Sequence, residues 1–168
     1  MKIYNINEGS LHIVSEFMAK IKPVWWDIEG ARRQLSSGVG WYFGQSEEGP
    51  KGWILCKPIN VYKTVEIECL GYDDNGTFTI GKELQPLVKE VEEWAKSKDF
   101  SIVRFTIGSR GLSCHLRPLG RPWEELKNIQ AVEREEYNWF ISMGYVPSGM
   151  LPNIYGENYH GILLVKQL

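Results

Sequence analysis

The chain has 168 residues, of which 43% are hydrophobic, and a formal net charge of −2 at pH 7. This length and composition suit one globular domain, so we expect a single domain over residues 1–168. The slightly negative charge argues against a duplex DNA binder, whose affinity depends on clustered lysine and arginine, and no nucleic-acid partner is expected.

The first third of the chain predicts one strand and two helices. KIYNIN indicates a short strand, and a helix follows over LHIVSEFMAKI, with Ser10 expected as its cap and Pro23 as its end. The run IEGARRQLSS predicts a second, shorter helix that stops near Gly38. The first helix is predicted from apolar residues at helical spacing, namely Leu11, Val14, Phe17, Met18 and Ile21.

Three strands are predicted next. Residues 41–45 and 53–57 flank the turn residues 47–52 and indicate a hairpin. In the strand expected over residues 64–72, apolar residues alternate with mostly charged ones, which predicts one buried face and one mixed face. The buried face is expected to hold Val65, Ile67 and Cys69, and the mixed face Glu66, Glu68 and Leu70.

A helix is expected over about residues 82–98, because a single apolar stripe runs along it. The stripe consists of Leu84, Leu87, Val88, Val91, Trp94 and Ala95. Pro86 is tolerated in a first turn but disrupts a helix interior, so the regular helix begins no earlier than about Lys82 or bends there.

The remaining pattern predicts a strand over residues 101–107, a helix over residues 131–144 and final strands over residues 145–155 and 158–168. Hairpins and helical crossovers both occur in this order of elements. We therefore expect an α/β fold with a mixed sheet.

Neither metal binding nor a disulfide framework is expected. The scattered residues are Cys56, Cys69 and Cys114, together with His12, His115 and His160. An odd number of scattered cysteines indicates reduced thiols, and no paired ligand spacing suggests zinc. No apolar stretch approaches the roughly 20 residues that span a membrane, and the start lacks the apolar run of a signal peptide. We expect a cytoplasmic protein with no membrane partner.

The stretch NGTFTIGKEL is a glycine-containing turn that runs into the predicted helix. Amides from Thr77 to Lys82 could converge on a pyrophosphate there, because a helix start offers unpaired N–H groups and the positive end of the helix dipole. The alternative is an ordinary loop before a core helix, since every helix has such an end.

Several strings occur in an order that resembles the GNAT superfamily of N-acetyltransferases. VEIECLGYDD resembles that family's fourth strand, and IGKEL followed by VEEWAKSKDF resembles its cofactor-binding turn and next helix. FISMGYVPSGM resembles its late helix and sixth strand, and GILLVKQL its closing strand. The first third matches only in element order. The resemblance implies a mixed, mostly antiparallel twisted sheet of six to seven strands flanked by about four helices.

The resemblance also implies acetyl-CoA as acyl donor, no metal, and direct transfer to a primary amine of a small molecule or a peptide. The cofactor would lie in a V-shaped opening between the fourth and fifth strands, with its pyrophosphate on the turn. The implied cofactor-binding residues are Leu70, Gly71 and Tyr72 for the pantetheine, and Gly76, Thr77, Phe78, Thr79, Ile80, Gly81 and Lys82 for the pyrophosphate. Of the turn's three motif positions, only Gly81 fits the family pattern.

For catalysis, the resemblance points to Glu66 as general base, with Glu68 beside it, because two nearby carboxylates raise one another's proton affinity. The alternative is a solvated strand face or a salt bridge to Arg104. The family's usual acid, a tyrosine, is replaced here by Phe140. Tyr137, one helical turn earlier, is the substitute acid or, alternatively, a packing aromatic.

Trp25 and Trp26 lie in a connector that, in the resembling family, covers the acceptor site. Two indoles form an apolar wall or receive a cation, although one could instead cap the core.

The long segment of residues 108–130 carries Arg110, Arg117 and Arg121, which suit an anionic acceptor group or the 3′-phosphate of CoA. Alternatively, this segment is a solvent-exposed loop without a binding role that contains a short helix at PWEELKNI.

Two functional hypotheses remain. The first is a GNAT-type acetyltransferase, and the second is a non-catalytic CoA- or small-ligand-binding module on the same fold, suggested by the unusual turn and Phe140. The sequence names no acceptor and leaves the oligomeric state open, a homodimer included.

Overall fold

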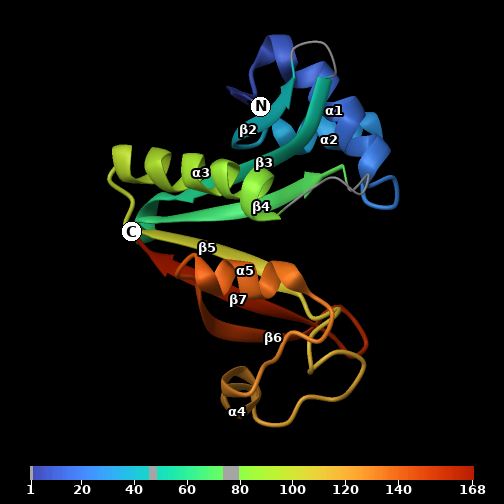
Figure 1. Cartoon of the computed structure of the whole chain (residues 1–168), viewed down its shortest axis with the longest axis vertical. Coiled ribbons are helices and arrows are strands. Elements are labelled where there is room, and N and C mark those ends of the chain that lie inside the picture. The colour runs from blue at the N-terminus through green and yellow to red at the C-terminus, as the bar shows by residue number, and fades with distance from the viewer. Residues whose placement is uncertain (1, 46–48, 74–79) are drawn as a thin grey trace. The chain divides into compact units, whose positions relative to one another are not determined.

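The computed structural model describes residues 2–45, 49–73 and 80–168. The chain forms two compact units, Met1–Ser101 and Ile102–Leu168 (Figure 1). The described residues form seven strands and five α-helices. The predicted class, an α/β fold with mostly antiparallel strands, is confirmed. The expectation of one domain stays a prediction.

The first unit contains four antiparallel strands in the order β1-β2-β3-β4. They are β1 (Lys2–Asn5), β2 (Val39–Gln45), β3 (Gly49–Ile59) and β4 (Thr64–Tyr72), with a short 3-10 turn, η1 (Asn60–Tyr62), before β4. The predicted hairpin is present, but β3 begins at Gly49, inside the expected turn. The predicted bounds of β4 are confirmed.

Helix α1 (Glu8–Ile21) begins two residues before the predicted cap, Ser10. Asn7 is the N-cap, and its side chain accepts a hydrogen bond from the Ser10 backbone at 3.2 Å. The Ser10 hydroxyl in turn accepts from the Asn7 backbone at 3.0 Å, which closes a capping box. The prediction of Ser10 as cap is therefore wrong, because Ser10 fills the other position of the box. Helix α2 (Ile28–Leu35) follows, capped by Asp27.

Helix α3 (Gln85–Ser97) is preceded by a π-helical turn, η2 (Ile80–Leu84). The α-helix starts later than expected because η2 occupies the first predicted turn, and Pro86 lies in the first turn of α3, where its missing N–H is tolerated. The predicted apolar stripe is confirmed: Leu84, Leu87, Val88, Val91 and Ala95 are fully buried, and Trp94 is half-buried.

The helices of this unit cover opposite faces of its strands. Neighbouring residues of a strand point to opposite faces. On β2, Tyr42 packs against the core of α1 and α2, whereas Trp41 contacts Trp94 of α3 with ring centroids 6.0 Å apart. The core under α1 and α2 consists of Val14, Met18, Ala31, Leu35, Trp53, Leu55 and Cys69.

The second unit contains β5 (Ile102–Gly108), β6 (Val146–Gly156) and β7 (Tyr159–Gln167), antiparallel in the order β5-β7-β6. Helix α5 (Glu135–Ser142) is shorter than predicted and packs through Phe140, whose ring lies 5.2 Å from that of Phe105. The short helix predicted at PWEELKNI is confirmed as α4 (Pro122–Lys127).

Candidate active site

Strand β4 carries a bulge at Glu68. Leu55 of β3 pairs with Cys69, whereas the next residue, Cys56, pairs with Ile67, so Glu68 is an extra residue between them. A bulge shifts the alternation of the side chains that follow it. Cys69 thus joins the core under α1 and α2, on the face opposite to Ile67. The predicted strict alternation of β4 is therefore wrong beyond Ile67.

The two carboxylates of β4 have different surroundings. Glu68 Oε2 lies 3.3 Å from Lys57 Nζ and accepts a hydrogen bond from Gln34 Nε2 at 3.4 Å. Glu66 is half-buried and stands opposite Lys57 in the strand register. An amine that approached Glu68 would compete with Lys57 and Gln34. The catalytic roles given to Glu66 and Glu68 stay predictions.

The end of β4 holds the residues predicted to contact pantetheine, namely Leu70, Gly71 and Tyr72. Gly71 is paired with Trp53, and a Cβ at Gly71 would lie 2.2 Å from the indole ring. Trp53 is fully buried. The indole therefore covers one face of the backbone at Gly71, and this close approach requires glycine. The pantetheine contact itself stays a prediction.

The predicted pyrophosphate turn is only partly described. Gly76, Thr77, Phe78 and Thr79 lie outside the described residues. Ile80, Gly81 and Lys82 begin η2, where Gly81 and Lys82 are exposed. Within the part of the chain that the structure describes, no side chain caps the start of α3, which continues directly from η2. The first N–H groups of a helical segment can bind an anion, but binding here stays a prediction.

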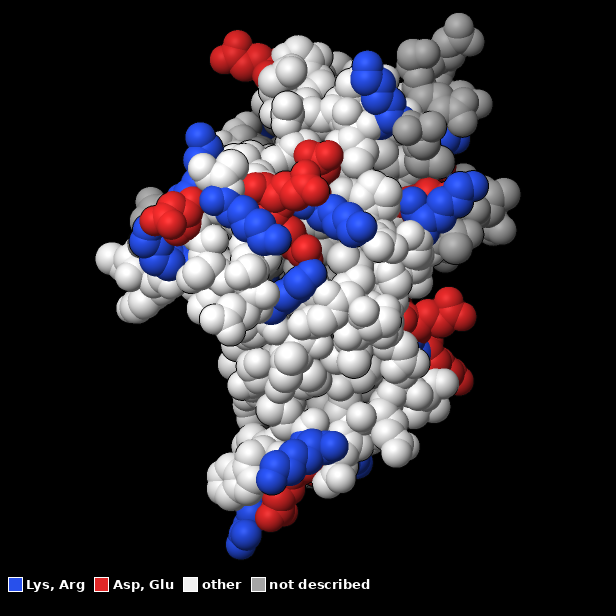
Figure 2. Space-filling model, turned by 60° about the vertical axis from the view of Figure 1, so that its left-hand side comes forward, with Lys and Arg blue, Asp and Glu red and all other residues white. Residues whose placement is uncertain are grey.

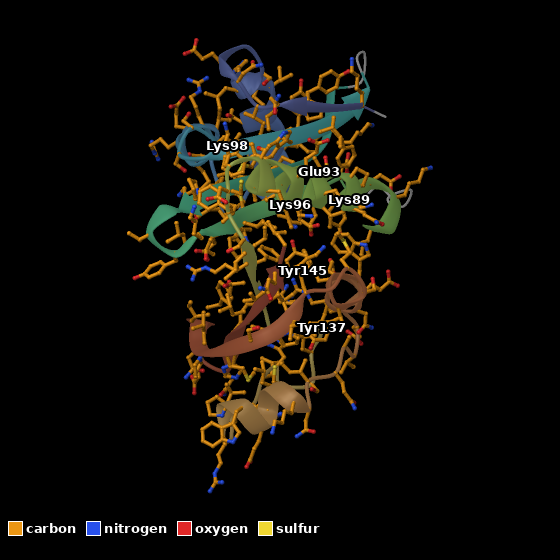
Figure 3. All side chains as sticks on the ribbon, turned by 90° about the vertical axis from the view of Figure 1, so that its left-hand side faces the viewer. Lys89, Glu93, Lys96, Lys98, Tyr137 and Tyr145 are labelled. Atoms are coloured by element: carbon orange, nitrogen blue, oxygen red, sulfur yellow. The ribbon has the colours of Figure 1, made fainter. Side chains whose placement is uncertain are left out.

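The outer surface of α3 carries charges of both signs. Figure 3 labels Lys89, Glu93 and Lys96 of this helix and its C-cap residue Lys98, and all four are exposed. In Figure 2, lysine and arginine are interleaved with aspartate and glutamate on this face of the first unit. A face of mixed sign lacks the single-sign field that attracts a nucleic-acid backbone.

The two tryptophans of the α1–α2 connector differ in burial. Trp26 packs against the core under α1 and α2, whereas the side chain of Trp25 is 63% exposed. Their ring centroids are 6.0 Å apart. The core contact accounts for Trp26 structurally, while Trp25 presents its indole to solvent. Substrate binding by either residue stays a prediction.

Helix α5 holds the predicted acid. Tyr137 is 6% exposed, and burial raises the pKa of its hydroxyl above the ordinary value of 10.0. Phe140 is fully buried and packs edge-on against Tyr145, at 5.2 Å between ring centroids. Figure 3 labels Tyr137 and Tyr145 in this unit. A phenol that keeps its proton at neutral pH is suited to donate it, and the role of Tyr137 stays a prediction.

The arginines of the long segment are not equivalent. Arg117 makes two hydrogen bonds to the Glu125 carboxylate, at 2.8 and 2.6 Å. The bond from Arg117, followed by that from the Gly120 backbone, lowers the pKa of Glu125 to about 2. Arg121 lies 3.5 Å from Glu124. Arg110 is exposed and lies over the ring of Tyr159.

Other candidate features lie elsewhere. A groove of about 500 Å³ between β1 and the start of α1 contains none of the predicted site residues. Cys56, Cys69 and Cys114 are buried free thiols, and burial raises the pKa of Cys56 and of Cys69 to about 12. In the described ranges, no three His, Cys, Asp or Glu side chains gather as around a metal ion. None of the helices in this part of the chain is both long and apolar enough to cross a bilayer.

The fold is shared with solved acetyltransferases. An aminoglycoside 6′-N-acetyltransferase complexed with coenzyme A matches with a TM-score of 0.85 at 16% identity, over 99% of this chain and 97% of that one. The aminoglycoside 6′-N-acetyltransferase from Enterococcus faecium matches with a TM-score of 0.81 at 16% identity, over 99% of this chain and 97% of that one. The ribosomal-protein-S18-alanine N-acetyltransferase from Escherichia coli matches with a TM-score of 0.67 at 9% identity, over 99% of this chain and 92% of that one.

The chain therefore has the GNAT acetyltransferase fold, as the sequence resemblance predicted. No family model matches the chain, and no curated protein matches it in sequence.

Proposed function

We propose that the chain is an N-acetyltransferase that moves the acetyl group of acetyl-CoA directly to a primary amine. The observation that carries the proposal is the fold match, over 99% of the chain, with an acetyltransferase bound to coenzyme A. Because identity to that protein is 16%, the chemistry is argued from this chain's own residues. We propose residues 1–168 as one catalytic domain.

The proposed reaction needs one proton acceptor and one proton donor. The ammonium form of the acceptor first loses one proton to solvent, which frees the nitrogen lone pair. The nitrogen then attacks the thioester carbonyl, a C–N bond forms, and Glu66 accepts the proton that the nitrogen loses in this step. The C–S bond breaks and the departing thiolate receives a proton from Tyr137, so the products are the acetylated amine and CoA with a thiol. Proton exchange with solvent returns Glu66 to its carboxylate and Tyr137 to its phenol. Glu68 stays bonded to Lys57 and Gln34 and helps to hold this face of β4 in place.

The proposed cofactor contacts are made mostly by backbone. Leu70, Gly71 and Tyr72 at the end of β4 take the pantetheine, and the turn that ends at Lys82 takes the phosphates. Backbone donors explain how a turn with unusual side chains can still serve, because the N–H groups do the binding. The exposed indole of Trp25 forms part of the acceptor site, where it receives the cationic amine.

A second function, a non-catalytic module that binds CoA or another small ligand, is favoured by one observation. At the position where the resembling family has its acid, this chain has Phe140, which is fully buried in an aromatic cluster and has no proton to donate.

Two measurements test these functions. Isothermal titration with CoA, supported by thermal unfolding, should show binding and a raised midpoint, because a ligand that binds only the folded state stabilises it. If millimolar CoA produces no heat and no protection, both the acetyltransferase and a module that binds CoA are contradicted. Thiol release from acetyl-CoA is then followed with a panel of amines that includes aminoglycosides, polyamines, amino acids and peptides. CoA binding with no acetylation of any amine selects the binding module.

A further inference from the structure

A cluster of aromatic and cationic side chains surrounds Tyr159 in the second unit. The Tyr159 ring centroid lies 5.1 Å from that of His115 and 5.2 Å from that of Tyr155, and Arg110 Cζ lies 5.9 Å from it. A Cβ at Gly108 would lie 2.6 Å from the Tyr159 hydroxyl oxygen, so glycine is needed for the ring to rest there. The ring is thus a fixed platform at one end of the unit.

The segments that build this cluster lie side by side at the same end of the second unit (Figure 1). The segment after β5 is joined to the β6–β7 turn by a hydrogen bond from the Leu116 N–H to the Asn158 carbonyl, at 3.1 Å. Leu116 has a left-handed φ of 58° although its side chain is 75% exposed. Such a conformation costs free energy in a leucine and recurs at ligand-binding sites.

A contact with the buried Ser109 hydroxyl orients His115. Ser109 is fully buried, and its Oγ accepts a hydrogen bond from the His160 backbone at 3.0 Å. The same Oγ lies 3.0 Å from His115 Nδ1. Because Nδ1 faces Ser109, the other ring nitrogen of the half-buried His115, Nε2, faces away from that bond.

Arg110 differs from Arg117 and Arg121, which both have a carboxylate partner within the same segment. Arg117 is hydrogen-bonded to Glu125 and Arg121 lies 3.5 Å from Glu124, whereas Arg110 makes no ion pair with any carboxylate of the described residues. The Arg110 side chain instead makes a cation–π contact with Tyr159. A guanidinium on an aromatic face keeps its in-plane donors available for two parallel hydrogen bonds to an oxyanion.

We infer that Arg110, with His115 and Tyr159, binds a carboxylate or phosphate group carried by the amine acceptor. The acceptor is then an amine with an anionic group, such as an amino acid or a phosphorylated amine, rather than a pure polycation. This rests on the proposed function, in which the cofactor's phosphates are bound by the turn that ends at Lys82.

The first test requires no acetyl transfer. The protein is titrated with inorganic phosphate at constant ionic strength and followed by amide NMR. We expect saturable shifts in residues 108–116 and 153–160, lost in Arg110→Gln and kept in Arg121→Gln, which changes an exposed arginine outside the cluster. Arg110→Lys should bind several-fold more weakly, and thermal melts show whether each variant folds. No saturable shift in these residues of the wild type overturns the inference and leaves the proposed function intact.

The second test compares acceptors that differ only in an anionic group: lysine against cadaverine, and phenylalanine against phenethylamine. We expect wild-type kcat/KM to favour the carboxylated amine by about 10- to 100-fold, since charged hydrogen bonds are the strong ones. In Arg110→Gln the preference should fall toward one through a rise in KM. An unchanged preference overturns the inference. Phosphate binding at Arg110 without CoA binding would instead contradict the proposed function.

A third comparison separates the acceptor from the cofactor as the source of the anion. Affinities for CoA and for 3′-dephospho-CoA are measured on wild type and Arg110→Gln. We expect the substitution to leave both unchanged. If it weakens CoA tenfold and leaves 3′-dephospho-CoA unchanged, Arg110 holds the cofactor's 3′-phosphate and the inference is wrong.

Discussion

The two units hold their charged candidate residues in different ways. On β4 of the first unit, Glu68 is bonded to Lys57 and Gln34. In the second unit, Arg110 rests on Tyr159 and makes no ion pair with a described carboxylate. A carboxylate with partners from its own fold mainly positions the strand, whereas a cation that has only an aromatic platform can take its counter-ion from a ligand. This difference is the basis for the proposals that Glu68 positions strand β4 and that Arg110 binds a ligand.

The largest expected effect concerns the two carboxylates of β4. Glu66→Gln removes the proposed proton acceptor with little change in shape, and we expect kcat to fall by about 10²- to 10⁴-fold, the usual contribution of a general base. CoA affinity, measured by titration calorimetry, should stay the same. Glu68→Gln should cost less than about tenfold, because its partners Lys57 and Gln34 already occupy the carboxylate. Equal losses in the two variants would show that Glu68 is as important for the reaction as Glu66.

The next effect is on stability and tests how tightly β4 is packed. Gly71→Ala places a methyl group 2.2 Å from the buried Trp53 ring, so we expect a loss of about 1–3 kcal/mol in the free energy of unfolding. Chemical denaturation measures it. Gly149→Ala is the matched control on β6, since its nearest neighbour would be at 3.6 Å, an ordinary contact. A Gly71→Ala protein as stable as the control would mean that Trp53 can move away from this strand.

Features with local causes were predictable from the sequence. The stripe of α3 follows from a period of 3.6 residues. The bounds of β4 were predicted correctly from an alternating pattern, although the bulge at Glu68 interrupts that alternation in the structure. The cap of α1 was missed by three residues because Asn7 and Ser10 are the two halves of one capping box. Either residue type is a good cap, and sequence alone gives no reason to prefer the first.

Features that depend on distant partners were not predictable. The bulge at Glu68 arises from the register between β3 and β4, and the sequence of β4 alone does not predict it. The cluster around Tyr159 depends on the bond between Ser109 and His160, which are 51 residues apart. The sequence could say that three arginines lie in one long segment. Only the folded chain shows that Arg117 and Arg121 have carboxylate partners.

A smaller effect sharpens the contrast between Arg110 and Arg117. The pKa of Glu125 is lowered from 4.5 to about 2, so its pair with Arg117 adds stability above about pH 4.5 that is lost as the pH falls toward 2. The pair is partly exposed, and we expect less than about 1 kcal/mol. Melting temperatures of the wild type and Glu125→Gln, measured from pH 7 to pH 2, should differ at the top of this range and converge at the bottom. A constant difference would mean that the stabilisation does not depend on the charge of Glu125.

The smallest expected change in stability comes from the connector between α1 and α2. Trp25 is 63% exposed, so Trp25→Ala should alter the free energy of unfolding by no more than about 0.5 kcal/mol. Trp26→Ala should cost several times more, because Trp26 packs against the core. If Trp25 receives the acceptor amine as proposed, its loss raises KM for the amine several-fold and leaves CoA affinity unchanged. If neither stability nor KM changes in Trp25→Ala, this indole does not contact the acceptor, and the acceptor site would have to be sought away from the connector.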